Sequence, residues 1–138
     1  MDAEAGVYCS MSPDELVAID GLRAIQKLVH QTETDAGWNT DLKTGLPIKR
    51  NFGELISLVH SELSEALEAH RKCKLRDDKL PWHDAVTVEL ADAVIRILNI
   101  ASSRGTDLAA AILDKDKFNR ERADHKLENR VLDGGKKY

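Results

Sequence analysis

Apolar residues recur at intervals of three and four along most of this chain, which is the spacing of one face of an α-helix. Four segments carry the pattern, and their starts carry capping residues or a proline. The first of them, Ser12-Pro13-Asp14-Glu15, reads as a capping box. Alternation with a period of two is scarce, so we expect no sheet. The predicted helices run from residue 13 to about 35, 51 to about 73, 81 to about 104, and 106 to about 127.

Between these segments the pattern predicts one long loop and one charged turn. Residues 36–50 contain Gly37, Gly45 and Pro47, and a loop of this length inside a compact domain often carries function. A plain surface connection is the alternative. Residues 74–79 form the turn, and residues 1–11 and 131–138 read as loose ends. We expect a single all-α domain over residues 1–138, built as a four-helix bundle.

Composition narrows the class of protein. The chain has 138 residues, a formal net charge of −4 and 42% hydrophobic residues, as in an ordinary globular domain. We expect a cytoplasmic protein, because it has neither a signal peptide nor a membrane span, and two cysteines are too few for a disulfide framework. The acidic balance argues against binding to duplex nucleic acid. Residues 115–138 nevertheless hold eight Lys or Arg and five Asp or Glu, a local charge of +3.

Two pairs of acidic residues begin on faces that should be buried. At 100° per residue, Glu62 falls within the apolar arc of its helix and Glu65 just past its edge. In the next helix Glu89 lies next to the apolar arc and Asp92 one step further out. Four carboxylates brought together would repel one another, and a divalent cation removes the conflict. Ligands that are all oxygen favour Mg²⁺, with Mn²⁺ able to substitute, over zinc. The alternative is that each acid pairs with a nearby Lys or Arg at the rim of its helix.

The spacing of these acids resembles that of a known family. Glu62-x-x-Glu65, 23 further residues and Glu89-x-x-Asp92 form an ExxE…ExxD pattern, which resembles the MazG-like all-α nucleoside triphosphate pyrophosphohydrolases. The stretch 117–122 (KFNRER) and the glycine-lysine end at 134–137 are similar to segments of that family. The resemblance covers residues from about 35 to the C-terminus. Two positions depart from it: Ser61 stands where some members carry a further acid, and Ala123 where proline is common.

The resemblance implies hydrolysis between the α and β phosphorus atoms of a nucleoside triphosphate. The four acids would hold metal, and Glu62 or Glu65 would also accept a proton from the attacking water. Cationic residues of the fourth helix are expected to bind the β and γ phosphates: Lys117, Arg120 and Arg122. Residues that could contact base or sugar are Trp38, Asn39 and Asn119. For Trp38, stacking on a base and packing within the protein remain equally open.

Other functions remain open at this point. A helical interaction module without catalysis would release no pyrophosphate, whereas relatives within the family act on dUTP or phosphoribosyl-ATP. A di-metal oxygenase bundle would need Glu-x-x-His, and the acids here are followed at the third position by other acids. The resemblance implies a homodimer or homotetramer. We expect (d)NTP substrates, with a preference for (d)GTP.

Overall fold

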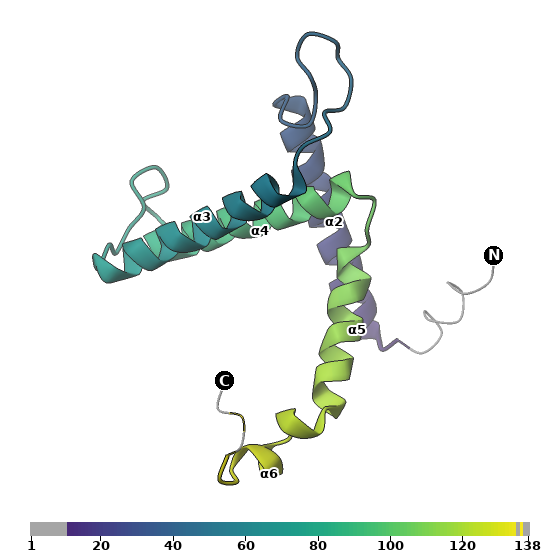
Figure 1. Cartoon of the computed structure of the whole chain (residues 1–138), viewed down its shortest axis with the longest axis vertical. Helices are drawn as coiled ribbons and strands as arrows, with labels where there is room; N and C mark the ends of the chain where they lie inside the picture. The colour runs from purple at the N-terminus through teal and green to yellow at the C-terminus, as the bar shows by residue number, and fades with distance from the viewer. Residues whose placement is uncertain (1–10, 135, 137–138) are drawn as a thin grey trace, which may run out of the picture. The chain divides into compact units, whose positions relative to one another are not determined.

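The computed structural model describes residues 11–134 and 136, and over these residues the protein is all-helical (Figure 1). The described residues contain no strand, and the Thr40–Pro47 pair forms an isolated bridge. The predicted all-α class is therefore confirmed. The helices are α2 (Pro13–Asp35), α3 (Phe52–Arg71), α4 (Ala85–Ser103), α5 (Leu108–Glu121), the 3₁₀ helix η1 (Ala123–His125) and α6 (Leu127–Arg130).

The chain divides into two compact units. One unit comprises Met1–Ala24 with Asp107–Tyr138, and the other comprises Ile25–Thr106. Helix α2 contributes its first half to one unit and its second half to the other. The four-helix bundle and the single domain over residues 1–138 stay predictions. No helix in the described part of the chain is long and apolar enough to cross a membrane.

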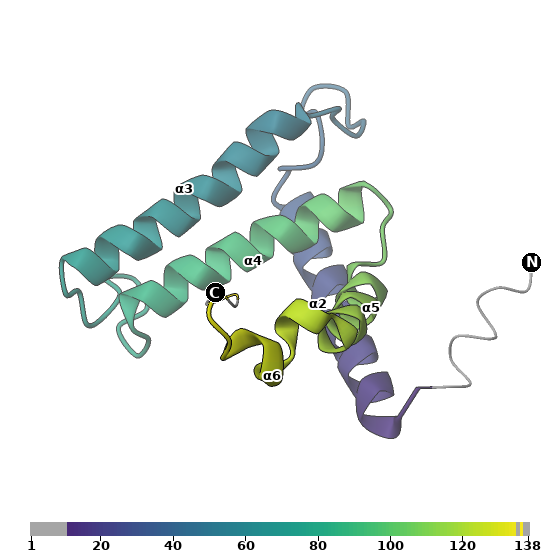
Figure 2. The ribbon, with the colours of Figure 1, turned by 60° about the horizontal axis from the view of Figure 1, so that its bottom comes forward.

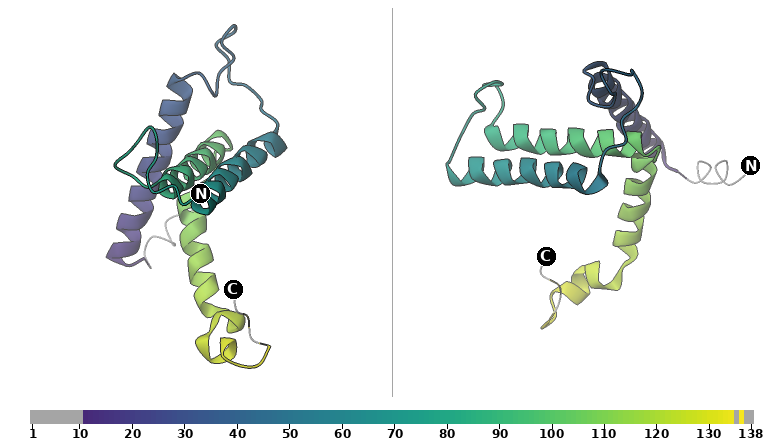
Figure 3. Two further views of the ribbon diagram at one scale, coloured as in Figure 1. Left: turned by 90° about the vertical axis from the view of Figure 1, so that its left-hand side faces the viewer. Right: turned by 45° about the horizontal axis from the view of Figure 1, so that its top comes forward.

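In the unit of residues 25–106, α3 and α4 lie side by side and run antiparallel (Figures 2 and 3). Each begins at a side-chain cap: Asn51 accepts from the Gly53 and Glu54 amides, and Asp84 accepts from the Thr87 amide. The residues buried along the two helices are mostly small, which lets their backbones approach closely. They include Val59, Ala66, Ala69, Ala93, Leu98 and Ala101.

The other unit contains the first half of α2 and the whole of α5. The predicted capping box is present: the Ser12 amide donates to the Glu15 carboxylate at 2.8 Å, and the Glu15 amide donates to the Ser12 hydroxyl at 3.3 Å. Ile19 of α2 and Ala109 of α5 are each 1% exposed. The Arg23 guanidinium pairs with Asp107, and this interaction joins the two helices.

The start of α4 and the end of α3 differ from the prediction. Helix α4 begins at Ala85 and not at Pro81, because the Asp77 carboxylate accepts from the Lys79 and Leu80 amides and holds this stretch as a turn. Helix α3 ends at Arg71, two residues early, since Cys73 has a φ of 52°, which is incompatible with a right-handed helix.

The fourth predicted helix is shorter than expected at both ends. Its N-cap is Asp107, which accepts from the Ala110 amide, while the Thr106 hydroxyl donates to the Ala101 carbonyl. It ends at Glu121 and not near Leu127, because Arg122 adopts an extended conformation. Of the predicted loose ends, residues 1–10, 135 and 137–138 lie outside the described residues.

Candidate metal centre and the adjoining cavity

Three of the four predicted acids come together between α3 and α4. One carboxylate oxygen from each of Glu62, Glu89 and Asp92 lies within 4.8 Å of the other two. Glu62 is 7% exposed, Glu89 is half-buried and Asp92 is exposed, so the group runs from the interior of the hairpin to its surface. Antiparallel packing places Glu62 of α3 opposite the first half of α4 and thereby produces this juxtaposition.

Glu65 is not part of this close group. It is exposed, one turn further along α3, and the Ser61 hydroxyl donates to its Oε1 at 3.5 Å. Its charge nevertheless acts on the site, because it raises the pKa of Glu89. The roles predicted for the four acids as ligands, and for Glu62 and Glu65 in catalysis, stay predictions.

The electrostatics of the group favour a cation. Burial is the main reason that the pKa of Glu89 is raised, and the negative charges of Glu65, Asp92 and Glu62 raise it further. Burial likewise raises the pKa of Asp92, followed by the charge of Glu62, while the positive charges of Arg96 and Lys79 oppose the shift. Both acids therefore resist carrying a full charge in the folded protein.

Arg96 supplies a positive charge within the cluster. Its Nε–H donates to Glu62 Oε1 at 2.6 Å, and a terminal nitrogen lies 2.6 Å from the same oxygen. The Glu62 side chain is 9% exposed and that of Arg96 is 40% exposed, so the guanidinium sits at the boundary between the hairpin interior and solvent. This pair compensates the most buried of the three acids.

The donor set fits Mg²⁺ or Mn²⁺. Octahedral Mg²⁺ with bonds of about 2.1 Å places neighbouring ligand oxygens about 3 Å apart and opposite oxygens about 4.2 Å apart. The three oxygens all lie within 4.8 Å of one another, which is close to these spacings. The residues that would hold the ion are Glu62, Glu89 and Asp92, and Glu62 would first have to exchange its bonds with Arg96.

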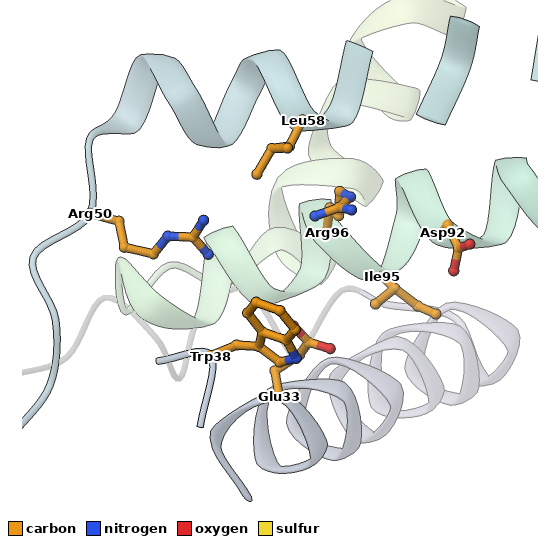
Figure 4. Close-up of a pocket in the computed structure, with 7 residues that line it drawn as sticks. All are labelled: Glu33, Trp38, Arg50, Leu58, Asp92, Ile95 and Arg96. Carbon is orange, nitrogen blue, oxygen red and sulfur yellow. The ribbon is translucent and has the colours of Figure 1, made fainter. Parts of the chain in front are cut away.

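A cavity of about 440 Å³ opens beside Asp92 (Figure 4). Trp38 and Glu33 line it from the end of α2 and the turn that follows, while Leu58 of α3 and Ile95 of α4 supply apolar walls. Two guanidinium groups also line it: Arg50 reaches in from the segment before α3, and Arg96 comes from α4. The cavity thus combines an aromatic ring, two cations and an edge of the acidic group.

Trp38 lies on a loop that is anchored to the helices. The Asn39 amide nitrogen donates to Asn99 Oδ1 at 2.9 Å and to the Thr34 hydroxyl at 3.1 Å, and the Asn99 amide donates back to Asn39 Oδ1 at 3.2 Å. His30 Nδ1 lies 2.8 Å from Asn99 Oδ1 and 3.4 Å from the Asn39 amide nitrogen, so it belongs to the same network. Asn39 therefore holds the loop in place, and it also lines a second cavity of about 430 Å³ with His30 and Asn99.

The fourth-helix residues predicted to bind substrate belong to the other compact unit. There Lys117 Nζ lies 3.1 Å from a Glu15 oxygen, and Arg120 pairs with Asp116. The Arg122 guanidinium donates two hydrogen bonds, of 2.9 and 2.7 Å, to the Asp124 carboxylate. The Oδ1 atom of Asn119 is buried and has no hydrogen-bond partner among the described residues. The binding roles of these four residues stay predictions.

Sequence reasoning missed the cavity residues Arg50, Arg96 and Glu33. For Arg96 a signal existed, since it lies four residues after Asp92 and seven after Glu89, on the same face of the helix. Arg50 had no comparable signal, because the conformation of the loop between α2 and α3 decides where it points. Glu33 lies near the end of α2, and its place in the cavity depends on how that helix packs, which no local pattern encodes.

No protein-family model matches the chain, and no curated protein or solved structure matches it either. The likeness to MazG-like enzymes thus continues to rest on the motifs of the sequence.

Proposed function

We propose that the protein is a Mg²⁺-dependent nucleoside triphosphate pyrophosphohydrolase of the MazG-like class, which converts a (d)NTP to the monophosphate and pyrophosphate. The observation that carries the proposal is the group of Glu62, Glu89 and Asp92 at the edge of a cavity containing Trp38 and two arginines. Carboxylates for a dication, guanidinium groups for phosphates and an indole for a base are the chemical groups that such a substrate requires.

Each residue has a separate part in this proposal. A bound Mg²⁺ would neutralise phosphate oxygens and lower the pKa of a water molecule. Glu62 and Glu65 are the candidates to accept the proton of that water, and Glu65 is better exposed to do so. Trp38, which is 61% exposed, offers a ring face for a nucleobase.

Self-association belongs to the same proposal. Large apolar side chains are exposed along both helices of the hairpin, including Leu63 and Leu67 on α3 and Leu90 and Val94 on α4. We expect a homodimer or homotetramer to cover part of this surface. Light scattering coupled to size exclusion measures the mass, and a monomer at high micromolar concentration would contradict this part.

The experiment that tests the function is a pyrophosphate assay with Mg²⁺ over the eight common NTPs and dNTPs. We expect release by the wild type, with guanine nucleotides preferred, and loss in Glu62→Gln and Asp92→Asn while helical circular dichroism is retained. Glu54→Gln, a change at an exposed acid in the first turn of α3, is the matched control and should remain active. Absence of release with all eight nucleotides, and with dUTP tested as a ninth, would favour a helical interaction module or a phosphoribosyl-ATP hydrolase.

A further inference from the structure

The unassigned feature of this site is Arg96, which contacts an acid on one side and a cavity on the other. Its guanidinium binds Glu62 Oε1, and the same side chain lines the cavity together with Trp38, Arg50 and Asp92. In Figure 4 Arg96 lies between the Arg50 side of the cavity and Asp92. A long flexible side chain in this position can reach either partner without any movement of α4.

The charges of the site indicate when Arg96 should change partner. With no cation present, Arg96 compensates Glu62, which is 7% exposed and would otherwise be an unpaired buried charge. A dication held by Glu62, Glu89 and Asp92 would take over this compensation and would repel the guanidinium. Arg96 then needs a new anionic partner.

The cavity offers room for that partner. The cavity has a volume of about 440 Å³, and the Arg50 guanidinium lines another of its walls. Among its lining residues the acids are Asp92 and Glu33. Guanidinium groups bind phosphate oxygens through two parallel hydrogen bonds, and two such groups in one cavity suit a ligand with several phosphates.

We propose that Arg96 exchanges Glu62 for a phosphate oxygen when a metal-bound triphosphate occupies the cavity, and that Arg50 is the second phosphate ligand. The inference rests on the proposed function, and it assigns phosphate binding to two residues of the unit that carries the acids. Arg96 is thus a competitor of the dication in the empty protein and a ligand of the substrate in the complex.

The test uses binding and not turnover. Mn²⁺ alone is titrated into metal-free full-length protein by calorimetry, and an α,β-methylene triphosphate and the corresponding monophosphate are then titrated in the presence of Mn²⁺. Arg96→Gln should bind Mn²⁺ alone about 3- to 10-fold more tightly, because the competing cation is gone, and should bind the triphosphate at least about 10-fold more weakly. Arg50→Gln should weaken triphosphate binding while leaving the affinity for Mn²⁺ alone unchanged.

Controls separate this pattern from general effects. Arg71→Gln, at the exposed end of α3, removes the same charge and should change neither affinity. If Arg96→Gln loses its helical circular dichroism, Arg96→Lys replaces it. The lysine variant keeps the charge without the forked geometry, so it should weaken triphosphate binding more than monophosphate binding.

Each outcome has a defined meaning. The inference is overturned if Arg96→Gln binds Mn²⁺ as the wild type does or more weakly. It is also overturned if Arg96→Gln, or Arg96→Lys where that variant is used, binds the triphosphate as the wild type does. If the expected binding pattern appears but the wild type releases no pyrophosphate, the inference holds and the proposed function fails. If the wild type hydrolyses triphosphates but Arg96→Gln binds both ligands as the wild type does, the inference alone fails. Absence of Mn²⁺ binding by the wild type overturns both.

Discussion

The Asn39 side chain anchors the long loop, and the stability lost when it is removed follows from its hydrogen bonds. Asn39→Ala removes three hydrogen bonds, two to Asn99 at 2.9 and 3.2 Å and one to Thr34 at 3.1 Å, together with a contact of 3.4 Å to His30 Nδ1. A neutral hydrogen bond contributes about 0.5–1.5 kcal/mol net, and a buried polar group left unpaired costs about 1–3 kcal/mol. Asn99 is 8% exposed and would lose its acceptor, whereas water can replace Asn39 at the Thr34 hydroxyl. We therefore expect a loss of about 2 kcal/mol.

Thermal and urea unfolding followed by circular dichroism measures this loss. With about 2.1 cal/mol/K of unfolding entropy per residue and 138 residues, 2 kcal/mol corresponds to a fall in Tm of roughly 7 °C. Gln31→Ala is the control, because its bond to Asp35 is exposed, and it should change stability by less than about 0.5 kcal/mol. Asn39→Ala and Asn99→Ala should also couple by at least about 1 kcal/mol in a double-mutant cycle. Additive effects, or a loss in Asn39→Ala no larger than in Gln31→Ala, would refute the anchor.

Two further predictions concern the acidic group and the cavity. The pKa of Glu89 is raised in the folded protein. As pH rises, the unfolded chain therefore loses this proton first, and the folded protein loses it only at a higher pH. In EDTA, stability should therefore rise as pH falls from about 8 through the raised pKa, and Glu89→Gln should stabilise the protein near neutral pH but not near pH 4. Urea titrations across this range check both statements, and a variant less stable at every pH would contradict them. Trp38→Ala should cost less than about 1 kcal/mol, since Trp38 is 61% exposed, and should reduce discrimination among bases. A large loss of stability with unchanged base selectivity would instead show that Trp38 packs within the protein.

The elements of the fold were largely predictable, because they depend on local signals. The Ser12 box and the Asn51 cap mark the starts of α2 and α3 within a residue, and the helical period marks the faces of α3 and α4. The errors at Pro81 and Leu127 have different origins. The Asp77 carboxylate closes a turn before α4, and Arg122 leaves the helical conformation after α5.

In the candidate site, the acids and Trp38 could be named from the sequence, but their neighbours could not. The helical period placed Glu62 toward the interior, and the structure buries it there. It gave no information on which neighbour would compensate that charge, because the Arg96 contact depends on the register between two helices. Arg50 and Trp38 share a cavity only through the path of the loop, which no short-range pattern encodes.

If Glu62, Glu89 and Asp92 hold a hard dication as proposed, Mn²⁺ titrated into metal-free protein and followed by electron paramagnetic resonance should report its binding at this group. We expect saturable binding by the wild type that is at least about 10-fold weaker in Glu89→Gln and Asp92→Asn, and unchanged in the surface control Glu54→Gln. Equal binding by the wild type and both site variants, or no saturable binding by the wild type, would contradict it.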